Sequence, residues 1–220
     1  PVGLLDFSVN GSGLRKEADW GTGYWQDTAQ GSIYNHFVTG VTHVGGAVEF
    51  VVWIHGEADA ARGTVTEEEY LRSLERFILQ QVRVDIDNGS GQAHLPFLVV
   101  AMVKRPGGKD DPHQAIRNAQ YRVIEKVPEC YLAATTLDLE NQGRQHLSAG
   151  AYLKMGERVA QTVLYVLGEE AYHRGPSIAE AKLIDEHTVD VKITHRGGTD
   201  FSPISRITGW EVFVEDTPLA

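Results

Sequence analysis

The chain has 220 residues, of which 42% are hydrophobic and 23% charged, as expected for a soluble globular chain with one α/β domain and a small appendage. Its formal net charge of −10 argues against nucleic acid as the main partner. No apolar run approaches the roughly 20 residues that span a bilayer, so we expect no membrane-spanning segment. The single cysteine, Cys130, lies in an apolar run and is expected to be a buried core thiol.

Strands and helices are predicted to alternate along the first 167 residues. Apolar runs predict buried strands at residues 2–9, 48–54, 95–103 and 130–135. Helices are expected from about residue 32, from 66 to 82 after a capping box, from 111 to 126, and from 148 to 167. A long loop is expected over residues 14–36. This alternation indicates an α/β fold with a doubly wound parallel sheet and helices on both faces.

The pattern changes after Pro176. Short strands are predicted at 181–184, 188–194 and 210–214, with glycine turns between them, and no helix fits there. We therefore expect two domains, residues 1–175 and residues 176–220. The second is expected to be the start of a β-sandwich-like appendage.

Four segments carry sequence motifs. They are a strand-and-turn segment from Pro1 to Leu14, Trp53-Ile54-His55-Gly56-Glu57-Ala58-Asp59, Ile116 to Gln120, and His146 to Tyr152. In this order and approximate spacing they resemble the SGNH (GDSL-like) hydrolases, specifically the sialate O-acetylesterase-like carbohydrate esterases. The resemblance covers about residues 1–165. It implies a three-layer, flavodoxin-like parallel sheet.

The resemblance also implies a chemistry, the hydrolysis of acyl esters on glycans by a serine that a histidine activates. His146 would be the general base, and Gly11 would donate its backbone N–H to the oxyanion. His55, where the family has glutamine, can also donate to an oxyanion, and Gly56 and Glu57 would shape the turn. Plainer roles stay open: a solvated loop histidine for His146, a simple turn glycine for Gly11, and a structural carboxylate for Glu57.

The chain departs from the family pattern in two further places. No nucleophile block is present, and Ser8 and Ser12 lie in the wrong block, so the serine is expected outside this chain. In the family, that block lies on the first strand of the sheet. We therefore expect another segment, or a longer polypeptide, to supply the missing strand. The aspartate expected three residues before His146 is Gly143, which leaves Asp138 or Glu140 to orient the imidazole.

Two functional hypotheses follow. The chain is part of a carbohydrate O-acetylesterase, or an SGNH scaffold that only binds glycans. The segment 193–214 resembles β-modules of surface enzymes and of phage-like tail fibres or spikes, which would place the protein outside the cell or on a virion, as a homo-oligomer if it forms a fibre. Trp20, Tyr24 and Trp25 either stack on sugar rings or pack beneath the loop. No cofactor or metal is expected, because no nucleotide fingerprint or zinc-ligand spacing is present.

Overall fold

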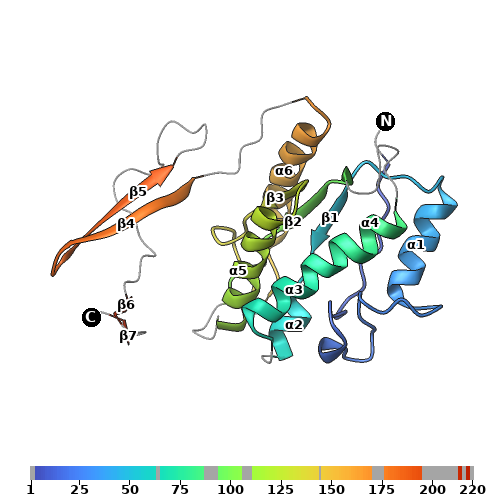
Figure 1. Ribbon diagram of the computed structural model, residues 1–220, viewed down its shortest axis with the longest axis horizontal. Coiled ribbons are helices and arrows are strands. Elements are labelled where there is room, and N and C mark those ends of the chain that lie inside the picture. The colour runs from blue at the N-terminus through green and yellow to red at the C-terminus, as the bar shows by residue number, and fades with distance from the viewer. Residues whose placement is uncertain are drawn as a thin grey trace. The chain divides into compact units, whose positions relative to one another are not determined.

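The computed structural model describes residues 3–62, 65–86, 94–105, 111–143, 145–169, 176–194, 213–214 and 217–218 (Figure 1). The chain divides into two compact units, Pro1–Tyr172 and His173–Ala220. Among the helices in these ranges, none is long and apolar enough to cross a membrane.

The first unit is built on a parallel sheet. Its strands are β1 (Val51–Ile54), β2 (Phe97–Val100) and β3 (Cys130–Ala134), paired in the order β1-β2-β3. The predicted parallel sheet is thereby confirmed. The strands are apolar on both faces because each face packs against helices.

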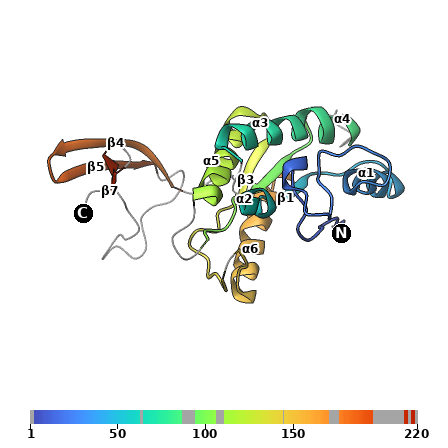
Figure 2. The same ribbon diagram turned by 90° about the horizontal axis from the view of Figure 1, so that it is seen from below.

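Side chains that alternate along the strands enter two separate cores. Trp53, Phe97 and Leu132 belong to one core, and Leu98 and Ala133 belong to the other. The helices α3 (Glu67–Phe77) and α5 (Asp111–Lys126) cover the first face, and α6 (Ala149–Val166) covers the second (Figure 2). The unit therefore has the expected three layers, with the sheet in the middle.

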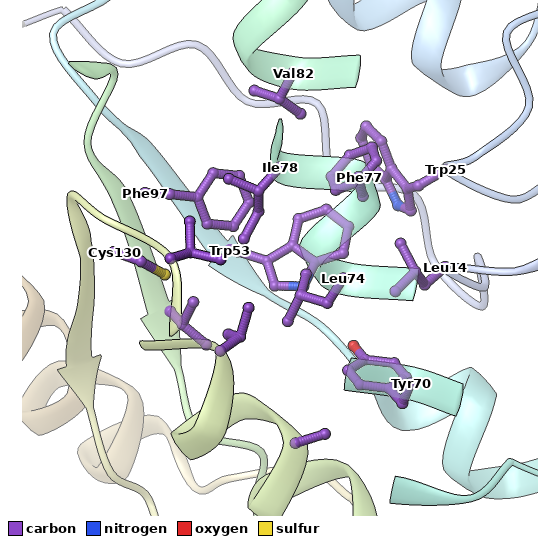
Figure 3. Packing of buried hydrophobic residues seen from close by; sticks show 14 of the residues in the cluster. Leu14, Trp25, Trp53, Tyr70, Leu74, Phe77, Ile78, Val82, Phe97 and Cys130 are labelled. Carbon is purple, nitrogen blue, oxygen red and sulfur yellow. The ribbon is translucent and has the colours of Figure 1, made fainter. Parts of the chain in front are cut away.

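The larger core lies between β1, β2 and α3 (Figure 3). Trp53 is 4.9 Å from Phe77 and 5.6 Å from Trp25 between ring centroids. Cys130 is buried at the edge of this core, as predicted, and burial raises the pKa of its thiol to about 12. Trp25 is thus core packing, so the alternative of sugar stacking does not apply to it.

The helices start where their capping residues stand. Thr66 and Glu69 form the predicted capping box of α3, and Ser32 caps α1 (Ile33–His43). The helix predicted to continue to residue 82 does so through a π-helical segment, η2 (Ile78–Val82), followed by the short α4 (Arg83–Asp85). The sequence reasoning missed α2 (Glu57–Arg62) and the 3₁₀ turn η1 (Lys16–Ala18).

The strand predicted at residues 2–9 is wrong over the described residues 3–9. These residues form no strand, and most are exposed. The backbone N–H of Ser8 donates to Oδ1 of Asp6 at 2.8 Å, a local bond in place of a ladder. The physical reason is a missing neighbour: within the described residues, β1 pairs with β2 along one edge and with no strand along the other. An apolar segment without a partner strand has no ladder to join.

The second unit contains an antiparallel hairpin of β4 (Ser177–Asp185) and β5 (Thr188–Thr194) and a short pair, β6 (Phe213–Val214) with β7 (Thr217–Pro218). Apolar residues face one another across the hairpin, with Val189 opposite Leu183 and Val191 opposite Ala181. Residues 188–194 match the prediction. Part of the strand predicted at 210–214 lies outside the described residues.

Candidate active site at the carboxyl end of the sheet

Gly56 forms the junction between β1 and α2. Its φ of +137° is a conformation that favours glycine, and a Cβ there would lie 2.9 Å from Cγ2 of Ile116 and 3.0 Å from Sδ of Met102. The backbone can therefore turn sharply at the end of the strand. Glu57, the first residue of α2, is placed at the carboxyl edge of the sheet, where open α/β sheets bind ligands.

His55 links the end of β1 to the turn at Gly11. Its buried Nε2 lies 2.9 Å from the backbone oxygen of Ser12. A carbonyl only accepts, so Nε2 carries the proton in this bond. Burial lowers the pKa of His55 to about 4, which keeps the ring neutral at pH 7. The predicted oxyanion role would require this N–H to leave the carbonyl of Ser12.

A second buried contact fixes the same turn from α2. The backbone N–H of Leu14 donates to Oδ2 of Asp59 at 2.8 Å, and Nε of Arg15 lies 3.5 Å from Oδ1. Asp59 is fully buried; burial raises the pKa of its carboxyl, against the lowering effect of the Leu14 N–H and of Arg15. These contacts fix the turn to α2.

The remaining contacts of the turn show that Ser12 has a structural role. Gly11 has a φ of +74°, and its carbonyl accepts from the Thr22 hydroxyl at 2.9 Å. The hydroxyl of Ser12 donates to the backbone oxygen of Val9 at 2.8 Å and accepts from Nε1 of Trp25 at 3.1 Å. Ser12 is thus a structural residue of the turn, as its place in the wrong block suggested.

Gln120 joins the ends of two strands from α5. Its Nε2 donates to the backbone oxygen of His55 at 2.8 Å, and its Oε1 accepts from the N–H of Met102 at 2.9 Å. The side chain is fully buried. The motif segment from Ile116 to Gln120 therefore supplies a side chain that holds the ends of two strands together.

His146 lies on an exposed loop before α6. Its backbone oxygen accepts from the N–H of Gln142 at 2.8 Å, and Asn141 and Leu147 form an isolated β-bridge. Ser148 then caps α6 through the N–H of Ala151 at 3.2 Å. His146 is exposed to solvent.

Burial raises the pKa of the Glu57 carboxyl, while a backbone hydrogen bond and the charge of His146 act in the opposite direction. Asp138, one of the two carboxylates suggested by the sequence, instead pairs with Arg158 through contacts of 2.8 and 2.5 Å. The other, Glu140, is exposed. The structure thus joins the Gly11 turn to the junction after β1, through His55 and Asp59, and places His146 on an exposed loop.

A family model matches residues 1–165 of this chain: the carbohydrate esterases described as sialic acid-specific acetylesterases. The chain belongs to this family. Among curated proteins no relative is found. A solved structure, that of the carbohydrate acetylesterase XAC1771 from Xanthomonas citri, matches with a TM-score of 0.58 and 21% sequence identity.

The XAC1771 match covers 76% of this chain and 36% of that one, so the chain spans about a third of the length of XAC1771. The likeness supports the SGNH-like esterase fold that the sequence predicted.

Two side chains of the site escaped the sequence reasoning. Asp59 belongs to the Trp53–Asp59 motif, and its place there was the signal that it has a function. Thr22 lies in a loop without any motif, and only the fold shows that it bonds to Gly11.

Proposed function

We propose that this chain forms the larger part of the active site of a carbohydrate O-acetylesterase, with His146 as the general base. The observation that carries the proposal is the buried bonding that joins three of the motif segments: Nε2 of His55 lies 2.9 Å from the backbone oxygen of Ser12, and Nε2 of Gln120 donates to the backbone oxygen of His55 at 2.8 Å. A carboxylate near the imidazole stabilises the imidazolium that forms when the base takes a proton. Glu57 would then supply the charge that Gly143 cannot.

In the proposed reaction a serine hydroxyl attacks the acetyl carbonyl while its proton passes to His146. The N–H of Gly11 stabilises the oxyanion, and its turn is held in place by His55 and Asp59. The ester C–O bond breaks, and His146 returns the proton to the sugar oxygen. Water then hydrolyses the acyl-serine by the same route, releasing acetate.

The serine of this reaction comes from a segment outside this chain that pairs with the open edge of β1. The exposure of Ile54, which is 53% accessible at the end of that strand, supports this proposal. A strand added at this edge would place its own carboxyl end beside Gly56 and the Gly11 turn. The partner is thus a strand whose sequence ends in a serine at the level of Gly56.

The test uses the intact protein that contains this chain. We expect release of acetate from glucose pentaacetate and from 4-nitrophenyl acetate, abolished by His146→Ala and strongly reduced by Glu57→Gln. A matched control, His43→Ala, changes an exposed histidine at the end of α1. Absence of acetate release from every acetylated sugar tried would overturn the proposal.

A second candidate is a glycan-binding scaffold without turnover, as the sequence also allowed. The observation that favours it is the Nε2–H of His55, which is engaged by the carbonyl of Ser12 and so is withheld from an oxyanion. Binding of acetylated glycans that survives His146→Ala, with no turnover in either protein, would support it. Membership of a tail fibre or spike stays a prediction, and light scattering on the intact protein tests it, because a monomer is incompatible with a fibre.

A further inference from the structure

We propose that Trp20 is a stacking platform for a sugar ring of the substrate, beside the Gly11 turn. This inference rests on the proposed esterase function and extends it to substrate recognition. Trp20, Tyr24 and Trp25 belong to one loop, and the structure separates them. Trp25 is buried in the core, whereas Trp20 is 55% exposed.

The loop that carries Trp20 is fixed to the candidate oxyanion turn. Two residues after Trp20, the hydroxyl of Thr22 donates to the carbonyl of Gly11 at 2.9 Å. The N–H of Gly13 donates to the carbonyl of Gly23 at 3.3 Å, and the N–H of Trp25 donates to the carbonyl of Gly13 at 2.9 Å. The loop that carries Trp20 is therefore hydrogen-bonded directly to the turn that would bind the reacting carbonyl.

The residue before Trp20 makes its loop rigid. One carboxylate oxygen of Asp19 accepts from the N–H of Gly21 at 2.7 Å and from that of Gly23 at 2.9 Å. These local bonds explain why the pKa of Asp19 is lowered. An aspartate that accepts from the second following residue closes a tight turn, which fixes the backbone on both sides of the indole.

Arg62 fixes the ring itself. Its guanidinium carbon lies 4.2 Å from the centroid of the Trp20 ring, and its Nη2 donates to the backbone oxygen of Asp19 at 2.7 Å. Arg62 is the last residue of α2, the helix that begins with Glu57. Five residues of α-helix rise about 7.5 Å, so one short helix carries both the residue that fixes Trp20 and the carboxyl of Glu57.

Trp20 is 55% exposed, so a ligand can reach its ring. A ring that is already immobilised loses little entropy when a ligand binds to it, which favours recognition. The apolar C–H face of a pyranose suits such a surface. A glycan whose acetylated residue reaches the Gly11 turn would place a sugar ring over Trp20.

The experiment compares two substrates in the intact protein: glucose pentaacetate, which has a sugar ring, and ethyl acetate, which has none. We expect Trp20→Ala to lower the ratio of their kcat/KM values about tenfold, mainly through KM for the sugar, as expected for the loss of one aromatic contact. Trp20→Phe should restore most of the ratio. The control Ile184→Ala, which removes an equally exposed side chain in the second unit, should leave the ratio unchanged.

The outcomes separate the two proposals. An equal loss on both substrates would mean that Trp20 only supports the Gly11 turn, and an unchanged ratio would mean that it makes no contact; either overturns the inference. If the wild-type protein hydrolyses neither ester, the esterase proposal fails. Calorimetric binding of glucose pentaacetate then decides the platform: equal affinity in wild type and Trp20→Ala contradicts it, and weaker binding in Trp20→Ala supports it.

Discussion

The two parts of the candidate site are held in opposite ways. The turn from Gly11 to Leu14 is fixed by buried side chains, through His55 to the carbonyl of Ser12 and through Asp59 to the N–H of Leu14. The loop of His146 is held mainly by backbone bonds, and its imidazole is exposed. A turn that must present N–H groups in a fixed direction benefits from rigid bracing, whereas a base that accepts and returns a proton must be accessible. The contrast predicts that substitutions in the two parts affect different properties.

The largest expected effect is on catalysis. His146→Ala should lower kcat/KM for acetylated substrates about 10⁴-fold, because the serine proton then has no acceptor. The free energy of unfolding should change by less than about 0.5 kcal/mol, since an exposed side chain is removed. Steady-state kinetics and urea unfolding of the intact protein measure both quantities. A large loss of stability in this variant would erase the contrast between the two parts.

Asp59→Ala should have the largest effect on stability. It leaves the buried N–H of Leu14 without its acceptor and removes one of the two carboxylates that pair with Arg15, which costs about 3 kcal/mol. Urea unfolding gives the value. The matched control is Asp138→Ala, which breaks a more exposed ion pair with Arg158 beside the His146 loop and should cost less than about 1 kcal/mol. Equal losses would show that the bracing of the turn is no stronger than a surface ion pair.

His55 should make stability depend on pH. Its pKa is about 4 in the folded protein and about 6.5 in the unfolded chain, so the unfolded chain binds the proton first as the pH falls. The contribution is fully present above pH 6.5 and is lost between pH 6.5 and 4, by up to about 3 kcal/mol. Urea unfolding at several pH values should show this slope in the wild type and a weaker slope in His55→Gln, which restores the family residue. Identical slopes in both proteins would mean that His55 is not held neutral by burial.

The sequence predicted the sheet well because continuous β-branched runs such as Val48 to Ile54 leave few alternatives to a buried parallel strand. It also predicted the helix caps Thr66 and Ser148, because a capping side chain bonds to a backbone N–H only three residues away. It failed at residues 3–9, because an apolar run becomes a strand only when another strand lies beside it, and that is a property of the whole sheet. The bond from Gln120 to the backbone oxygen of His55 joins residues 65 positions apart, and no local pattern encodes it.

The smallest expected effects are at the N-terminal cap of α6, where one substitution should change both stability and catalysis. Ser148 caps α6 two residues after His146, so Ser148→Ala should cost about 1 kcal/mol of stability through the lost bond to Ala151. Ser32→Ala removes the equivalent cap of α1 and should cost a similar amount. Only Ser148→Ala should also lower kcat, by about threefold, because a frayed first turn of α6 releases the loop that positions the base. If both variants leave kcat unchanged, the backbone bonds of its loop position His146, and the cap of α6 has no part in catalysis.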